Sequence, residues 1–298
     1  MSSSSSACHW LSPPPLRPGD RVRLVAASSA LAEATRLEAG IAILRDWGLR
    51  VEPGAADLVG RRWGYLAGRD DQRAADLLGQ ATATAASEPA AATPAHGDDS
   101  GDDRANNNDD DNSAAAPAGA GGRGLDPRTA PPGAPAPESR LERAVASRVQ
   151  AGAIQRLAAD LQPGASPAAL HACVRGGWGS ARLLERPLPQ PPGWLLGFSD
   201  VTSLLWARWA QGQSGGIHGP LLTTLAAEPA WSRERLRALL FGEPLAPLQG
   251  ESWSGGVAEG PLLAANLTVA THLLGTPHLP ALDGAILVLE DVGEAPYR

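Results

Sequence analysis

The sequence predicts an α/β fold built on a parallel sheet, and three neighbouring segments carry this prediction. Apolar residues alternate over residues 21–27, as in a β-strand, and residues 31–47 place apolar side chains on one helical face. A second short strand begins at residue 49, directly after Gly48. Strand, helix and strand in this order are typical of parallel sheets. We therefore expect an N-terminal parallel-sheet domain, followed by a smaller and incomplete C-terminal α/β domain.

The remaining elements are predicted from apolar runs and the turn residues that flank them. We expect helices at residues 69–78, 141–161, 201–211, 233–241 and 267–274, and strands at residues 168–174, 194–198 and 285–289. Residues 217–220 are expected to form either a strand end or a turn. Residues 264–266 are predicted to form a turn. Ser199 and Asp200 are expected to cap the helix that begins at residue 201.

Composition changes along the chain and indicates domain boundaries. Residues 1–16 are rich in Ser and Pro and are expected to be a disordered tail. Residues 82–138 contain mainly Ala, Pro, Gly, Asp and Asn, which bury too little apolar surface to offset their ordering entropy. We predict a disordered insertion there, within an N-terminal domain of residues 17–243. Residues 244–298 are expected to form the incomplete C-terminal domain.

Charge and hydropathy exclude several classes of protein. The formal net charge is −7, and no cluster of basic residues forms a face for nucleic acid. No apolar run approaches the roughly 18 residues of a membrane span, and the first residues lack the pattern of a signal peptide. Cys8 and Cys173 have neither metal-ligand nor disulfide spacing. We expect a cytoplasmic protein without nucleic-acid or membrane partners.

A glycine-rich turn follows the predicted strand at residues 168–174. It reads GGWGS from Gly176 to Ser180, and an apolar helix start comes next. A serine on a sharp turn between strand and helix projects its hydroxyl, and the following N–H groups stabilise negative charge. This geometry suits a nucleophile that attacks a carbonyl. Because the pattern is not G-x-S-x-G, an ordinary glycine turn with a serine helix cap is the alternative.

Further short motifs occur in a defined order around this turn. They are Pro18-Gly19-Asp20, Tyr65-Leu66-Ala67-Gly68, Arg175 to Ser180, Gly197 to Thr202, His218-Gly219-Pro220, Asn266-Leu267-Thr268, Gly275-Thr276-Pro277 and Leu289 to Glu294. In order and spacing this set resembles the LD-carboxypeptidase family of serine peptidases. That family includes the muramoyltetrapeptide carboxypeptidases and the microcin C immunity peptidases. The resemblance extends from about residue 17 to residue 298, apart from the insertion.

The resemblance implies a Ser–His–Glu catalytic triad in a cleft between the two domains. The serine belongs to the N-terminal domain and maps onto Ser180. The glutamate belongs to the C-terminal domain and maps onto Glu290, with Asp291 and Glu294 as competing candidates. Backbone N–H groups of Ala181 and Gly177 are the expected donors to the oxyanion.

The resemblance places the triad histidine well beyond the Leu-Glu-Asp motif. None of the histidines in this sequence holds that position; they are His9, His96, His171, His218, His272 and His278. Without a general base, a serine hydroxyl stays protonated and is a poor nucleophile at neutral pH. We therefore expect the 298-residue chain by itself to be inactive.

Other residues near these motifs are candidates for supporting roles. Trp178 either walls the substrate pocket or belongs to the core, and Asn266 either holds loop backbone or contacts substrate. Arg175 could counter a carboxylate, whereas His218 is expected to be a structural hydrogen-bonding residue behind the site. Asp200 is expected to cap its helix rather than take part in chemistry. The sequence contains no metal or nucleotide motif, so no cofactor is expected.

Three functional hypotheses follow from the resemblance. The first is a serine carboxypeptidase that cleaves the L,D-amide bond to the terminal D-alanine of murein tetrapeptides during peptidoglycan recycling. Its partner would be a small muropeptide, and a homodimer is a reasonable expectation. The second is hydrolysis of a peptidyl-nucleotide antibiotic of the microcin C type. The third is an inactive, truncated pseudoenzyme that binds muropeptide without cleaving it.

Overall fold

The computed structural model describes residues 12–53, 57–79, 167–186 and 188–293. All of them belong to one compact unit, and the second unit, residues 84–139, lies outside the described residues. The predicted helix at 141–161 and the predicted disorder at 82–138 therefore lie outside the described residues as well. The domain boundary expected near residue 244 stays a prediction.

The larger sheet has five parallel strands and confirms the predicted fold class. Its strands are β1 (Arg21–Val25), β2 (Arg50–Glu52), β3 (Leu170–Cys173), β4 (Trp194–Gly197) and β5 (Gly216–His218), in the spatial order β2-β1-β3-β4-β5. Every residue of β3 and β4 is buried. This is the behaviour of central strands in a parallel sheet, because helices cover both faces.

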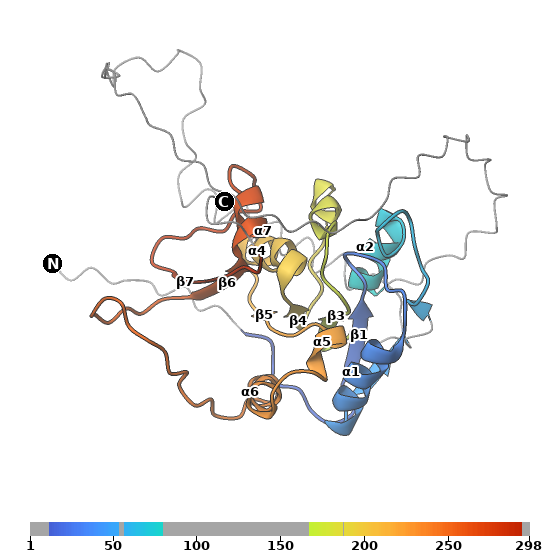
Figure 1. Cartoon of the computed structure of the whole chain (residues 1–298), viewed down its shortest axis with the longest axis horizontal. Helices are drawn as coiled ribbons and strands as arrows, with labels where there is room; N and C mark the ends of the chain where they lie inside the picture. Colours follow the sequence, from blue (N-terminus) through green and yellow to red (C-terminus); the bar gives the residue numbers. More distant parts are fainter. Residues whose placement is uncertain (1–11, 54–56, 80–166, 187, 294–298) are drawn as a thin grey trace, which may run out of the picture. The chain divides into compact units, whose positions relative to one another are not determined.

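Helices cover the sheet on two sides, and each side has its own apolar core (Figure 1). The first core includes α1 (Thr35–Asp46), α5 (Leu222–Leu225) and α6 (Ala230–Phe241), and the second includes α2 (Asp70–Leu78), η2 (Ser180–Glu185) and α4 (Thr202–Ala210). Helix α1 buries Leu37, Ile41 and Leu44, the residues with the predicted helical spacing. Gly40 lets α1 contact α5 closely, since a Cβ there would lie 2.1 Å from the Leu222 carbonyl oxygen.

A second sheet pairs β6 (Leu262–Asn266) with β7 (Ile286–Glu290) in parallel, and α7 (Leu267–His272) follows β6. The turn predicted at residues 264–266 is wrong, because these residues pair with β7. Small side chains misled the prediction, since Ala264 and Ala265 carry little strand propensity. The sheet is anchored to α4 by a hydrogen bond from Trp206 Nε1 to the Ala264 carbonyl oxygen at 3.0 Å.

Leu16, which the sequence predicts to lie in a disordered tail, is an ordered part of the fold. Leu16 is buried in the first core, and its N–H donates to the Leu240 carbonyl oxygen at 2.8 Å. Leu16 thereby satisfies one of the unpaired carbonyls at the end of α6. Elsewhere, no helix within the described ranges is long and apolar enough to cross a membrane.

Candidate active site

The carboxyl ends of the strands bring together the segments that carried the sequence motifs. The glycine turn follows β3, Ser199 follows β4, and His218 is the last residue of β5. In the second sheet, Asn266 and Glu290 are register partners at the ends of β6 and β7. Ligands of parallel α/β proteins bind at this edge of the sheet. The candidate site therefore consists of the residues at these strand ends.

Close packing against Ser29 explains the glycine at position 177. Gly177 has φ = +107°, and a Cβ there would lie 2.1 Å from Ser29 Oγ. The Ser29 hydroxyl accepts a hydrogen bond from the Trp178 N–H at 3.1 Å. Glycine is required because it tolerates positive φ and leaves space for this contact.

A buried arginine holds the far end of the turn. The Arg73 side chain is fully buried and donates to the carbonyl oxygens of Ala27 and Gly179, the latter at 2.8 Å. It also pairs with Asp70 Oδ1 at 2.5 Å. A buried guanidinium is stable when it is paired and hydrogen-bonded in this way. Arg73 thus fixes the backbone directly before Ser180.

Ser180 does not project its hydroxyl, so that part of the prediction is wrong. Ser180 is 0% exposed. Its Oγ donates to the Asp200 carbonyl oxygen at 2.6 Å and shares a hydrogen bond with Ser203 Oγ at 2.6 Å. Its N–H donates to Asp200 Oδ2 at 2.8 Å. The hydroxyl points into the protein because Asp200, just before α4, and Ser203, in the first turn of α4, offer it buried partners.

Ser199 has the backbone geometry that the sequence predicted for Ser180. Within the described residues, Ser199 is the one non-glycine residue with positive φ, at +61°. It is half-buried and lies between β4 and the helical segment that leads into α4. A serine in this conformation costs on the order of 1 kcal/mol, and such strain concentrates at functional sites. A strained serine between strand and helix is the signature of a nucleophile elbow.

The glycine turn packs directly against Ser199. A Cβ at Gly176 would lie 3.1 Å from both Cβ and Oγ of Ser199. The missing side chain at Gly176 therefore opens the space beside the hydroxyl. A sequence signal for Ser199 existed in Gly197-Phe198-Ser199-Asp200, a serine placed between a strand and a helix.

Asp200 has a different role from the helix cap that was predicted. Neither Ser199 nor Asp200 makes a side-chain cap bond to the helix that follows. The Asp200 side chain instead accepts the Ser180 N–H, and Asp200 is 3% exposed. Asp200 thus ties the turn after β3 to the turn after β4.

Glu290 ends β7 beside two polar neighbours. Asn266 Nδ2 lies 3.5 Å from Glu290 Oε2 and 3.3 Å from Asp291 Oδ1. Asn266 Oδ1 accepts the Val269 N–H at 3.1 Å and so caps α7. Asp291 accepts the N–H and hydroxyl of Thr268 at 3.0 and 2.7 Å. Asn266 and Asp291 therefore hold loop and helix backbone, whereas the Glu290 carboxylate accepts only the long hydrogen bond from Asn266 among the described residues.

Glu290 also faces the imidazole of His218. His218 Nε2 lies 3.5 Å from Glu290 Oε1, and the Phe198 ring packs edge-on at 6.1 Å from His218. Burial raises the pKa of the Glu290 carboxyl and lowers the pKa of His218. Both shifts disfavour the charged forms. Within the described chain, His218 Nδ1 and Glu290 Oε1 are buried atoms without a hydrogen bond.

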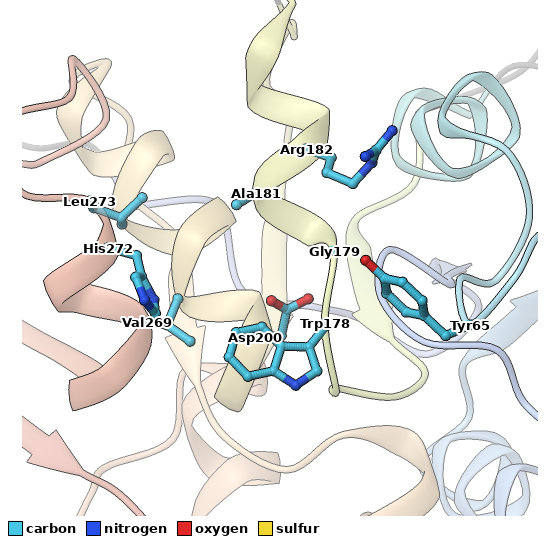
Figure 2. A pocket seen from close by; sticks show the side chains of 9 residues that line it. All are labelled: Tyr65, Trp178, Gly179, Ala181, Arg182, Asp200, Val269, His272 and Leu273. Atoms are coloured by element: carbon cyan, nitrogen blue, oxygen red, sulfur yellow. The ribbon is translucent and has the colours of Figure 1, made fainter. Parts of the chain in front are cut away.

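A pocket of about 470 Å³ is lined in part by Asp200, the residue that follows Ser199. Figure 2 shows its lining, which consists of Tyr65, Trp178, Gly179, Ala181, Arg182, Asp200, Val269, His272 and Leu273. Trp178 is 58% exposed and packs edge-on against His272, with ring centroids 6.4 Å apart. Trp178 and Ala181, two of the predicted binding residues, line the pocket, whereas Gly177 and Asn266 do not.

The other candidate residues are placed as follows. Arg175 donates to the Ala30 carbonyl oxygen at 2.8 Å. Glu294 lies outside the described residues. Among the residues that the structure does describe, no group of three or more His, Cys, Asp or Glu side chains could hold a metal ion.

The fold and site define an α/β protein with a strained serine at a strand end and a carboxylate nearby. Residues 22–90 and 129–219 match the LD-carboxypeptidase N-terminal domain, and residues 259–298 match the LD-carboxypeptidase C-terminal domain. The chain is 37% identical over 298 residues to slr1534 of Synechocystis sp., a protein named as a candidate carboxypeptidase. This match covers 99% of the chain and 71% of the relative. The chain belongs to the LD-carboxypeptidase family.

Other similar proteins are consistent with this assignment. Murein tetrapeptide carboxypeptidase of Pseudomonas aeruginosa is 37% identical over 148 residues, which is 42% of this chain and 46% of the relative. The solved muramoyltetrapeptide carboxypeptidase of Oxalobacter formigenes has a TM-score of 0.54 at 18% identity, covering 93% of this chain and 68% of its own. The wild-type microcin C7 self-immunity protein has a TM-score of 0.55 at 17% identity, covering 94% and 71%. These two structures share the fold.

Proposed function

We propose that the protein is a serine LD-carboxypeptidase that releases the terminal D-alanine from murein tetrapeptides. The observation that carries the serine mechanism is the positive φ of Ser199 between β4 and the following helix. The substrate class follows from the names of relatives, including the murein tetrapeptide carboxypeptidase that shares 37% identity over 148 residues. The protein thus acts in peptidoglycan-related peptide processing.

Ser199 takes the nucleophile role in this proposal, in place of Ser180. Attack on a carbonyl requires a hydroxyl that substrate can reach. Ser199 is half-buried and, within the described chain, has no side-chain hydrogen bond, whereas Ser180 is fully buried with its hydroxyl bonded to Asp200 and Ser203. Ser180 acts as a positioning residue that holds the residue after the nucleophile.

The oxyanion donors follow from the same geometry. The N–H of Asp200 is the first one after the nucleophile and starts a helical segment, where N–H groups lack intrahelical acceptors. A second donor comes from the glycine turn, with Gly177 as the candidate, because Gly176 packs directly against Ser199. Two backbone donors of this kind stabilise the charge that develops on the carbonyl oxygen. Asp200 replaces Ala181 in this role.

Glu290 is the acidic member of the triad in this proposal. It would orient an imidazole and stabilise the imidazolium that forms on proton transfer. His218 contacts Glu290 through Nε2, but its Nδ1 is buried and makes no hydrogen bond to Ser199. His218 therefore does not complete a Ser–His–Glu relay. The general base therefore stays unassigned among the described residues.

The test is D-alanine release from a murein tetrapeptide by the protein as its host produces it, with the 298-residue chain assayed in parallel. Ser199→Ala should abolish release and also labelling by a fluorophosphonate probe, because both need the nucleophilic hydroxyl. Ser180→Ala is the matched control and should retain labelling. An aminoacyl-nucleotide substrate, assayed beside the tetrapeptide, tests the microcin-type alternative. Full activity of Ser199→Ala would overturn the proposal, and binding without turnover by the natural protein would favour a pseudoenzyme.

A further inference from the structure

Arg182 is the one guanidinium that lines the 470 Å³ pocket. It projects from η2, on the side opposite His272 and Leu273, and Tyr65 lies on its own side (Figure 2). The rest of the lining is mainly aromatic, aliphatic or backbone, apart from the carboxylate of Asp200 and the imidazole of His272. A pocket of this size and composition takes a small ligand whose polar groups are few and specifically held. Arg182 is the group suited to hold a negative one.

The charge around Arg182 is not balanced by its ion-pair partner. Asp70 pairs with Arg182 at 2.9 Å and also with the buried Arg73 at 2.5 Å. One carboxylate therefore serves two guanidinium groups, and the three side chains carry a net charge of +1. Arg73 Nη1 donates to the carbonyls of Ala27 and Gly179, and its buried Nε makes no hydrogen bond. Of the two guanidinium groups that share Asp70, that of Arg182 is the accessible one, because its side chain is 41% exposed.

The Arg182 side chain is also held in place, with donor capacity to spare. Its Nε and Nη2 reach Asp70, and its guanidinium lies over the Trp63 ring, 5.7 Å from the centroid. Nη1 makes no hydrogen bond to any residue in the described ranges. An arginine fixed on one edge and open on another is preorganised to bind a carboxylate.

Asp200 connects this pocket to the chemistry. It lines the pocket and directly follows the proposed nucleophile Ser199. A peptide held at Ser199 therefore has the pocket beside it, with Trp178, Val269 and Leu273 available for its apolar parts.

We propose that this pocket binds a carboxylate-bearing part of the peptide substrate and that Arg182 is the carboxylate's partner. The inference rests on the proposed peptidase function for the identity of the ligand. It predicts that the protein selects peptides by negative charge in addition to the bond that is cleaved. Two sources supply the charge in a murein tetrapeptide: the C-terminal carboxylate and the carboxylates within the peptide.

The experiment measures binding by calorimetry in the Ser199→Ala background, so that catalysis does not enter. Three tetrapeptides are compared: the free acid, the C-terminal amide, and a peptide whose internal carboxylates are amidated. Arg182→Gln should weaken binding of the free acid roughly 10- to 100-fold, as expected for a lost charge-assisted hydrogen bond. It should leave unchanged the affinity of whichever amidated peptide lacks the recognised group. Arg182→Lys should recover part of the affinity.

Arg186→Gln is the matched control, because Arg186 is exposed at the end of the same 3₁₀ helix and does not line the pocket. Melting temperatures of both variants show whether loss of the Asp70 pair unfolds the site. If Arg182→Gln weakens all three peptides equally, or none of them, the inference is overturned. If the wild-type protein binds peptides as predicted but releases no D-alanine, the proposed function fails while the carboxylate site stands.

Discussion

The N–H of Ser180 donates to a carboxylate oxygen of Asp200 at 2.8 Å, and the Ser180 hydroxyl donates to the carbonyl of the same residue at 2.6 Å. These two bonds tie the turn after β3 to the turn after β4, which carries Ser199. Both residues are buried, so solvent does not compete for the bonds. Ser180 consequently controls the position of Asp200 and, through it, of the proposed nucleophile.

Ser180→Ala should lower both stability and turnover without abolishing either. Loss of the hydroxyl removes two buried hydrogen bonds, whereas Ser203 Oγ still donates to the Asp200 carbonyl at 3.1 Å, so we expect a cost of about 1 kcal/mol for each lost bond. We expect a fall in kcat of roughly 10-fold with little change in KM, since the elbow is loosened but Ser199 is intact. Thermal melts and steady-state kinetics measure the two effects. Complete loss of fluorophosphonate labelling would instead identify Ser180 as the nucleophile.

Gly176→Ala should reduce activity more than stability. The new Cβ would lie 3.1 Å from Cβ and Oγ of Ser199, so the serine must shift by a few tenths of an ångström. Small displacements of a reacting group cost up to about 100-fold in rate. Gly255→Ala is the control, because a Cβ there meets nothing within 4 Å. Unchanged kcat in Gly176→Ala, at an unchanged melting temperature, would argue against a precise fit at Ser199.

The pKa values of Glu290 and Asp291 should be shifted in opposite directions although the two residues are adjacent. Burial raises the pKa of Glu290, whereas hydrogen bonds from Thr268 lower the pKa of the exposed Asp291. Carboxyl-carbon NMR titration should therefore place Glu290 above its ordinary value of 4.5 and Asp291 below 3.8. Thr268→Val should raise the pKa of Asp291 and leave Glu290 nearly unchanged. Two carboxyls with ordinary pKa values would contradict the described geometry.

His171 should make the protein less stable in acid. Burial lowers its pKa from 6.5 to about 3. Between these pH values His171 is protonated in the unfolded chain and neutral in the folded protein. The free energy of unfolding therefore falls as the pH falls from 6.5 towards 3. The slope is at most about 1.4 kcal/mol per pH unit for one histidine. Urea unfolding between pH 7 and pH 4 should show a shallower decline for His171→Gln, and equal slopes would disprove this role.

Several elements could be predicted from the sequence because their signals are local. Strand β1 follows from alternation at residues 21–27, and α1 from the helical spacing of Leu37, Ile41 and Leu44. The family resemblance rests likewise on short motifs in a fixed order. Strand β6 was missed because a run of small residues has no local signal, and its pairing with β7 is set by contacts distant in the sequence.

The proposed nucleophile shows the limit of reasoning from sequence. Glycine density drew attention to Ser180, although Ser199 also stood between a predicted strand and a predicted helix. Local patterns place both serines on turns, but they do not say which hydroxyl finds buried partners. Asp200, just before α4, and Ser203, in the first turn of α4, supply those partners to Ser180. Backbone φ at Ser199 is likewise a property of the folded chain.

Local patterning of apolar residues and turns was therefore sufficient for the parallel α/β class and most of the elements, and the order of short motifs was sufficient for the family resemblance. The tertiary structure alone revealed which serine is strained and accessible, that Asp200 joins two turns, and that Arg182 lines a pocket while sharing Asp70 with Arg73. The physical reason is the distance in sequence over which each kind of interaction acts. Periodicity is set by neighbours in sequence, whereas burial, hydrogen-bond partners and charge balance depend on residues that meet after the sheet has formed.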